Sequence, residues 1–159
     1  MVYYTEYPSP LGSLLLTAQD DALTGLWVDR RPQEDWIKME NHPILQLAGV
    51  WLDSYFRGDA PQTLVPLHPE GTAFQKVIWE ILLTIPYGQT RTYGSIAKEA
   101  AQKLGKEEMS AQAVGGAVGK NPISILIPCH RVVGSHGKLT GYAGGLPRKE
   151  WLLKHEKAI

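Results

Sequence analysis

The chain has 159 residues, 43% of them hydrophobic, which is enough to bury the core of one ordinary domain or of two small ones. Its sixteen basic and sixteen acidic side chains give a formal charge of zero, and its single cysteine excludes an internal disulfide and the paired thiolates of a structural zinc site. The sequence has no apolar run long enough to span a membrane and no signal-peptide pattern, so we expect a cytoplasmic protein that does not bind membranes.

The charge is divided unevenly along the chain. Residues 1–71 carry four basic and ten acidic side chains, a net charge of −6, whereas residues 72–159 carry twelve basic and six acidic ones, a net charge of +6. A basic half is typical of a surface that binds a polyanion such as nucleic acid, although an ordinary solvated surface could have the same composition.

The first lobe, residues 1–71, is predicted to be a small antiparallel sheet plus a helix. The apolar runs GSLLLTA and LTGLWVD are separated by the polar QDDA, as in a hairpin. HPILQLAGVWLDSYFRG then has a helical period that ends at Gly58. Its expected inward residues are Ile44, Leu47, Val50, Trp51, Leu52, Tyr55 and Phe56. DAPQTLVPLHPEG, with three prolines, is predicted to be the linker.

The second lobe, residues 72–159, is predicted to be mainly α. Thr72 and Gln75 have the spacing of a capping box, and a helix follows until Pro86. Its expected inward residues are Phe74, Val77, Ile78, Ile81, Leu82 and Ile85. TYGSIAKEAAQKLG is predicted to be a second helix, with Ile96, Ala97, Ala100 and Leu104 inward. A loop then leads to AQAVGGAVG, capped by Ser110, and the pair suggests a helix-turn-helix.

The glycines of AQAVGGAVG oppose its own helicity. Gly115, Gly116 and Gly119 each destabilise a helix by roughly 1 kcal/mol relative to alanine. Either close packing inside the lobe requires small side chains, or this face approaches a narrow surface. A DNA minor groove, about 6 Å wide, is such a surface. The last segment, GYAGGLPRKEWLLKHE, is predicted to be a glycine-rich loop and a helix with Pro147 near its first position.

The only cysteine lies in ILIPCHRVVG. The preceding PISILIP is predicted to be a buried strand or extended segment, with Cys129 at its edge. Many buried cysteines are only structural, but His130 and Arg131 follow here, and nearby cations lower the pKa of a thiol. A cysteine hydrolase is a further possibility. It needs a histidine that faces the sulfur, and adjacent residues project in different directions, so a bridging water between Cys129 and His130 fits better.

These motifs together resemble those of the O6-alkylguanine-DNA alkyltransferases. The resemblance runs from about Thr72 to Glu156 and rests on NPISILIPCHRVV, on TYGSIA and AQAVGGAVGKNP before it, and on GYAGGLPRKEWLLKHE after it. It implies a single-turnover repair protein that moves the alkyl group of O6-alkylguanine in double-stranded DNA irreversibly to its own cysteine. It also implies minor-groove binding, nucleotide flipping, no cofactor and no metal, and a monomer that can bind DNA cooperatively.

The resemblance assigns roles to individual residues. Cys129 is implied as the acceptor and His130 as the base acting through a water, with Glu156 holding the imidazole, while Tyr93 donates a proton toward guanine N3. Arg131 is implied to have a structural ion-pair role. The expected substrate-binding residues are Val132, Tyr142, Ala143, Val118 and Asn121, of which Asn121 braces the turn before the active-site segment.

The expected DNA-binding residues are Gln112, Ala113, Gly115 and Gly116. Gln112 departs from the family pattern, in which an arginine inserts into the base stack, so weaker duplex binding or flipping is expected. A non-catalytic sensor of alkylated DNA with the same fold is the main alternative, but such relatives lack the cysteine. A regulatory helix-turn-helix protein would need base-reading side chains that this helix mostly lacks.

Overall fold

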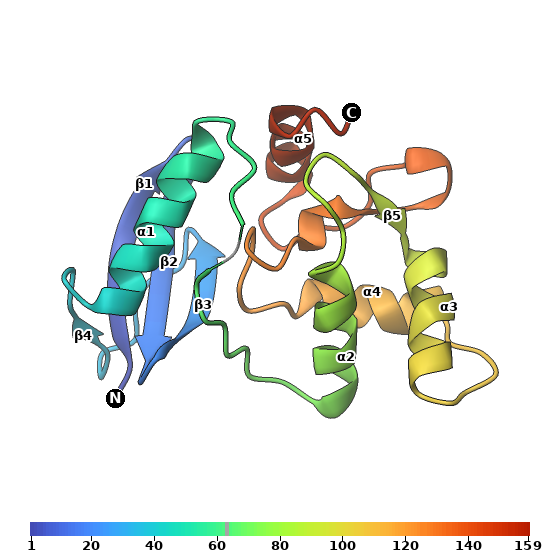
Figure 1. Cartoon of the computed structure of the whole chain (residues 1–159), viewed down its shortest axis with the longest axis horizontal. Coiled ribbons are helices and arrows are strands. Elements are labelled where there is room, and N and C mark those ends of the chain that lie inside the picture. The colour runs from blue at the N-terminus through green and yellow to red at the C-terminus, as the bar shows by residue number, and fades with distance from the viewer. Residues whose placement is uncertain (63) are drawn as a thin grey trace. The chain divides into compact units, whose positions relative to one another are not determined.

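The computed structural model describes residues 1–62 and 64–159, which form two compact units, Met1–Glu70 and Gly71–Ile159 (Figure 1). Thr63, in the expected linker, lies outside the described residues. Within this described part of the chain, no helix combines the length and the apolar composition needed to cross a lipid bilayer.

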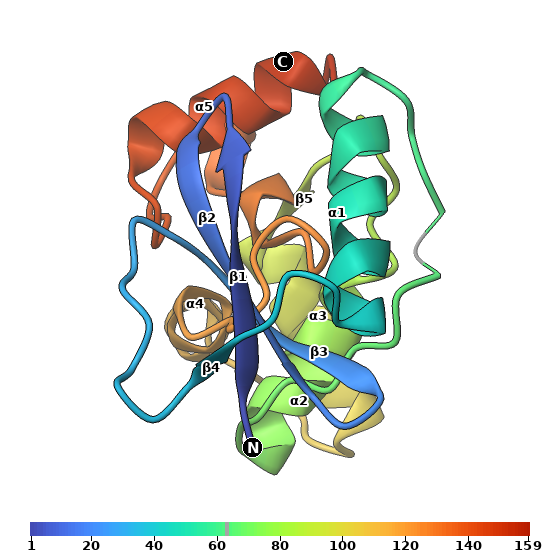
Figure 2. The same ribbon diagram turned by 90° about the vertical axis from the view of Figure 1, so that its left-hand side faces the viewer.

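The first unit is a four-stranded sheet with one helix on it. The strands are β1 (Tyr3–Ser9), β2 (Gly12–Gln19), β3 (Ala22–Val28) and β4 (Ile37–Lys38), in the order β3-β2-β1-β4. The expected β2–β3 hairpin is confirmed, with Gln19 opposite Ala22 and Asp20 in the left-handed region at φ 51°. The short β4 runs parallel to β1, a pairing that the sequence did not indicate (Figure 2).

Helix α1 (Pro43–Phe56) contacts β1, β2 and β3, and its position was predicted correctly. The expectation for two of its side chains is wrong, because Leu47 is 44% and Val50 67% exposed. The buried face consists of Ile44, Leu45, Ala48, Trp51, Leu52 and Tyr55. At about 100° per residue, Leu47 lies about a quarter of a turn and Val50 nearly half a turn away from the centre of this face, so apolar character alone placed them in the core.

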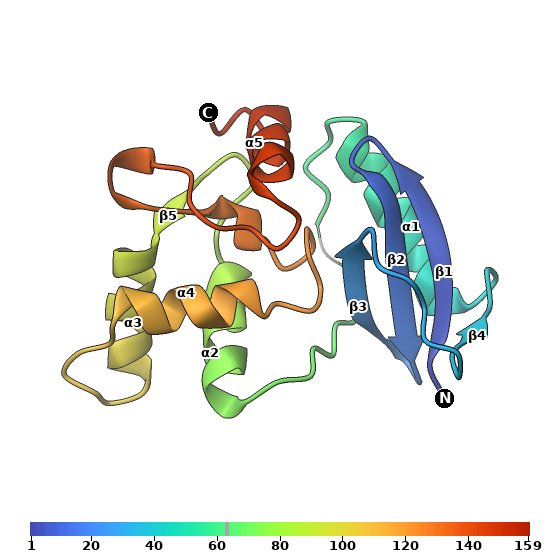
Figure 3. The same ribbon diagram turned by 180° about the vertical axis from the view of Figure 1, so that it is seen from behind.

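The second unit contains four α-helices among its described elements. They are α2 (Ala73–Leu82), α3 (Tyr93–Lys103), α4 (Ala111–Gly119) and α5 (Leu146–His155), with 3₁₀ turns η1 (Cys129–Arg131) and η2 (Ser135–Gly137). Figure 3 shows α4 crossing α2 and α3, and all three helices contact one another. Strands β5 (Arg91–Thr92) and β6 (Val132–Val133) form a small parallel pair. The expected α/β first lobe and helical second lobe are thus confirmed.

Local signals place the helix starts of this unit. The capping box of α2 is present: Thr72 Oγ1 accepts from the Gln75 amide at 3.1 Å, and Gln75 Oε1 accepts from the Thr72 amide at 2.9 Å. Ser110 caps α4 by accepting from the Ala113 amide at 3.0 Å. Trp79, not expected to point inward, is buried and donates from Nε1 to the Ala117 carbonyl at 2.9 Å, which ties α2 to α4.

Two expectations for the second unit are wrong. Leu104 is 36% exposed, because α3 ends at Lys103 and Leu104 leaves the helical period, and Ala101 is buried instead. PISILIP is buried but is a series of turns rather than an extended strand. Ile125 lies there at φ 71°, and the side chain of Asn121 supplies the hydrogen bonds that a strand partner would otherwise supply.

Candidate active site

The β5–β6 pair brings two distant parts of the chain together. Arg91 pairs with Val132 and Thr92 with Val133. Because α3 starts at Tyr93, immediately after β5, and η1 begins at Cys129, three residues before β6, the pairing places Tyr93 close to the cysteine.

A cavity of about 140 Å³ lies at this meeting point. Its lining residues are Tyr93, Gly115, Val118, Gly119, Cys129, Gly141, Tyr142 and Ala143. Six of the fourteen residues assigned from the sequence therefore line one cavity: Tyr93, Gly115, Val118, Cys129, Tyr142 and Ala143. A larger hollow of about 440 Å³ beside the loop between α3 and α4 is lined by none of the fourteen.

The other assigned residues lie around this cavity rather than on its wall. The buried ones are His130, Arg131, Val132, Asn121 and Glu156, none of which is among its lining residues. Gln112, Ala113 and Gly116 are on the exposed side of α4.

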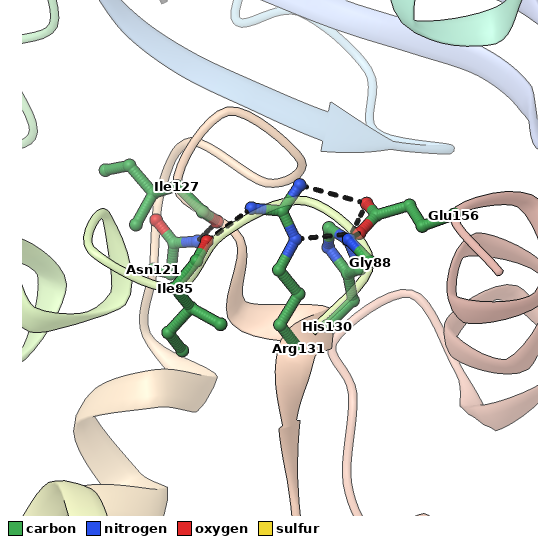
Figure 4. Close-up of polar contacts among 7 residues, drawn as sticks. All are labelled: Ile85, Gly88, Asn121, Ile127, His130, Arg131 and Glu156. Atoms are coloured by element: carbon green, nitrogen blue, oxygen red, sulfur yellow. Dashed lines mark hydrogen bonds and ion pairs between the residues drawn. The ribbon is translucent and has the colours of Figure 1, made fainter. Parts of the chain in front are cut away.

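Glu156 is the hub of a buried polar network (Figure 4). Its Oε2 lies 2.6 Å from His130 Nε2 and accepts from Arg131 Nη2 at 3.1 Å, while its Oε1 accepts from Arg131 Nε at 2.8 Å and from the Gly88 amide at 3.2 Å. Arg131 Nη1 donates to the Ile85 carbonyl at 2.7 Å. Figure 4 shows the guanidinium between that carbonyl and the carboxylate.

The network fixes the protonation of His130. Burial alone would raise the pKa of Glu156, but the hydrogen bonds and charges of His130 and Arg131 hold that pKa well below its ordinary value, so the carboxylate is ionised. Burial lowers the pKa of His130 in spite of Glu156, so the imidazole is neutral. Its one proton then lies on Nε2, facing the carboxylate, and Nδ1 is left as an acceptor with no partner among the described residues.

Cys129 rests as a thiol. It is 4% exposed, and burial raises its pKa, an effect that Asn121 and the charge of Lys149 oppose only in part. The sequence suggested that the adjacent cation lowers this pKa. The structure differs because burial outweighs the effects that lower the pKa, and the guanidinium of Arg131 is bound by Glu156 and Ile85. A thiolate must therefore be generated by transferring the proton to a base.

Asn121 shapes the turn that carries the cysteine. Its Nδ2 donates to the Ile127 carbonyl at 2.8 Å, and its Oδ1 accepts from the Ile123 amide at 3.0 Å. Only 6% of Asn121 is exposed, so these bonds form away from competing water. The side chain thus closes the turn between α4 and Cys129.

Helix α5 and the loop before it complete the cavity. Tyr93 Oη donates to the Thr140 carbonyl at 3.1 Å. Lys149, fully buried on α5, donates from Nζ to the same carbonyl at 2.9 Å and to the Gly141 carbonyl at 3.1 Å. No pattern marked Lys149 in the sequence, because a lysine between Arg148 and Glu150 in the first turn of a helix is ordinarily solvated.

The glycines of α4 are not required by packing within the unit. A Cβ built on Gly116 or Gly119 would meet none of the described atoms within 4 Å, and one on Gly115 would only touch the Tyr93 ring at 3.9 Å. The packing explanation is therefore wrong for Gly116 and Gly119. Their small size leaves α4 with a thin outer face, next to the cavity that holds Cys129.

Comparisons with known proteins agree with this geometry. Residues 73–158 match the family described as 6-O-methylguanine DNA methyltransferase, DNA binding domain, and residues 2–69 match its ribonuclease-like domain. A methylated-DNA–protein-cysteine methyltransferase of Haemophilus influenzae is 42% identical, covering 98% of this chain and 87% of its own. One of Methanosarcina acetivorans is 44% identical, covering 98% of both chains. Mycobacterium tuberculosis OGT, solved in complex with DNA, is 41% identical with a TM-score of 0.87 and covers 98% of this chain and 93% of its own.

Proposed function

The chain belongs to the 6-O-methylguanine DNA methyltransferase family and is a DNA-repair methyltransferase whose acceptor is a protein cysteine, and from this we propose how its own residues perform the transfer. In this proposal Cys129 accepts the alkyl group of O6-alkylguanine in double-stranded DNA. The sulfur–carbon bond of the product is a thioether with no route back, so each copy reacts once.

His130 generates the nucleophile. Its Nδ1 is the unprotonated nitrogen, and a water between Nδ1 and the sulfur can carry the thiol proton to it. The imidazolium that forms is stabilised by the ionised Glu156 at 2.6 Å. Arg131 keeps that carboxylate charged and fixed, which makes it a positioning residue for the base.

Tyr93 assists the leaving group. As the thiolate attacks the alkyl carbon, the carbon–O6 bond breaks and its electron pair passes to the guanine. The Tyr93 hydroxyl, in the same cavity as Cys129, then donates to N3 of the base. Burial raises the pKa of Tyr93, so its proton is retained until the base arrives.

DNA is engaged through α4. The reacting atom of a stacked base cannot reach the sulfur of Cys129, a residue that is 4% exposed, so the nucleotide must leave the helix and enter the cavity. The thin face of Gly115, Gly116 and Ala113 fits a minor groove, and Gln112, exposed on the same helix, fills the space left in the stack. We infer that one copy binds as a monomer and that neighbouring copies can bind cooperatively.

The observation that carries the proposal is the bond from His130 Nε2 to Glu156, since it leaves Nδ1 free to act as the base for the only cysteine. The test is to mix the protein with a duplex that contains one O6-methylguanine and to weigh the intact protein and its peptides. One methyl group per protein, located on Cys129 and not increasing with excess DNA, is expected.

Cys129→Ala should bind the duplex and gain no methyl group. Wild-type protein that binds alkylated DNA without becoming methylated would identify a sensor instead. Free product in excess over protein would identify a multiple-turnover enzyme such as a cysteine hydrolase.

A further inference from the structure

Lys149 has no role in the mechanism above, yet among the residues that the structure describes it is the only buried lysine. It comes from α5 and reaches the loop that supplies Gly141, Tyr142 and Ala143 to the cavity wall. Its ammonium makes two hydrogen bonds to backbone carbonyls and lies 5.8 Å from the centroid of the Tyr93 ring. In the described part of the chain, no carboxylate forms an ion pair with it.

We propose that Lys149 is a positioning residue that makes Tyr93 available as the proton donor, because it holds the Thr140 carbonyl to which the Tyr93 hydroxyl is otherwise bound. This inference rests on the role of Tyr93 in the proposed function.

The Thr140 carbonyl is shared by two donors. Tyr93 Oη donates to it at 3.1 Å and Lys149 Nζ at 2.9 Å. To donate to guanine N3, Tyr93 must release this carbonyl. A buried carbonyl left without any donor is costly, but a carbonyl oxygen has two acceptor positions and Lys149 occupies the other. The lysine therefore makes it easier for Tyr93 to turn toward the base.

The charge of Lys149 acts in the same direction. Burial lowers its pKa to about 8, so the group is mostly protonated at neutral pH and remains a strong donor. A cation beside the ring also favours the loss of a proton from the phenol. Arg131 is neutralised by Glu156. Arg148 donates to the Gly144 carbonyl, and its charge acts on Tyr142. Lys149 is the cation that lies over the Tyr93 ring, 5.8 Å from its centroid.

A double-mutant cycle tests this coupling. The single-turnover rate of methyl transfer is measured for wild type, Lys149→Met, Tyr93→Phe and the double variant. If Lys149 frees Tyr93, the rate loss caused by Tyr93→Phe should be at least about threefold smaller in the Lys149→Met background than in wild type. Methionine is chosen because it has a similar length but can neither donate to the Thr140 carbonyl nor carry a charge. Lys149→Gln, whose amide can still donate, then separates the effect of the hydrogen bond from that of the charge.

Lys154→Met is the matched control. Lys154 is on the same helix, its side chain is 64% exposed, and its partner is Glu150. It should leave both the rate and the effect of Tyr93→Phe unchanged. Rate losses that simply multiply in the cycle would show that Lys149 is only structural and would overturn the inference. Lys149→Arg, which keeps the charge and the donors, should restore most of the coupling. If wild type itself transfers no methyl group, it is the proposed function that fails, and the two failures are therefore distinguishable.

Discussion

Glu156→Gln removes one charge from the centre of the buried network and keeps the size of the side chain. The carboxylate accepts four hydrogen bonds, from His130, twice from Arg131, and from the Gly88 amide. An amide has only one oxygen, so its nitrogen would face donors that the carboxylate now satisfies. Arg131, whose side chain is 10% exposed, would be left as a buried cation without a counter-ion.

The expected destabilisation is large. Breaking a buried ion pair by removing one partner costs about 3–5 kcal/mol in the free energy of unfolding, out of a typical total of about 5–15 kcal/mol. For a chain of this size, at about 2–4 °C per kcal/mol, such a loss lowers the melting temperature by about 6 to 20 °C. Methyl transfer should slow as well, because the imidazolium of His130 would lose its stabilising charge.

The assay is urea unfolding followed by tryptophan fluorescence, with the methylation rate measured well below the midpoint. The matched control is Glu150→Gln on α5, where the carboxylate is 48% exposed and pairs with Lys154 one helical turn away. That change should alter the free energy of unfolding by no more than about 0.5 kcal/mol. A loss below about 1 kcal/mol for Glu156→Gln would refute the reasoning that the network is held together by this charge.

Three further predictions follow from the site. Gln112→Arg adds a cation on the exposed side of α4, so fluorescence anisotropy should show tighter duplex binding. The plot of the logarithm of the binding constant against the logarithm of salt concentration should become steeper by about 0.9. Unchanged affinity and repair rate would contradict the insertion of this side chain. Gly116→Leu should raise the free energy of unfolding by about 0.5–1 kcal/mol, because leucine favours a helix more than glycine does and the added Cβ meets open space. The same change should weaken duplex binding at least tenfold. Binding as tight as that of wild type would show that DNA does not approach this face of α4 closely. The free energy of unfolding should fall from pH 7 to pH 5 in urea titrations, because burial lowers the pKa of His130 and only the unfolded chain takes up that proton below about pH 6.5. Glu156, whose pKa is held low in the folded chain, adds a loss of the same sign in more acidic solution. A free energy of unfolding that stays constant above pH 5.5 would show that His130 is not buried in its neutral form.

The elements that the sequence predicted best carry local signals. Thr72 and Ser110 cap their helices through side chains three residues away from the amides they bind, so the information lies in a single turn. PISILIP shows the limit of such reasoning. Its burial follows from composition, but its turns depend on the Asn121 side chain and on Ile125 in the left-handed region, and neither is a feature of an apolar run.

In the site, too, the residues could be predicted from motifs, whereas the properties set by packing could not. Motifs and their family resemblance named Cys129, His130, Glu156 and Tyr93, and the structure places Tyr93 and Cys129 in one cavity and joins the other two in a buried hydrogen bond. The protonation states could not be predicted, because burial sets them and burial arises from the packing of α2, α5 and η1. Lys149 was missed for a related reason: its charged neighbours in the sequence predict a solvated side chain, and only the position of α5 against the loop at Thr140 buries it.

The burial and protonation of Cys129 also protect it from oxidation before the protein meets alkylated DNA. Peroxides attack a thiolate much faster than a thiol, and they must reach the sulfur to do so. Cys129 is 4% exposed and burial raises its pKa, so the sulfur rests as a thiol and little of the residue meets solvent. For a protein that reacts once, every sulfur lost to oxidation is a repair event lost. The burial that keeps Cys129 protonated until His130 accepts its proton therefore also keeps more copies of the protein able to react.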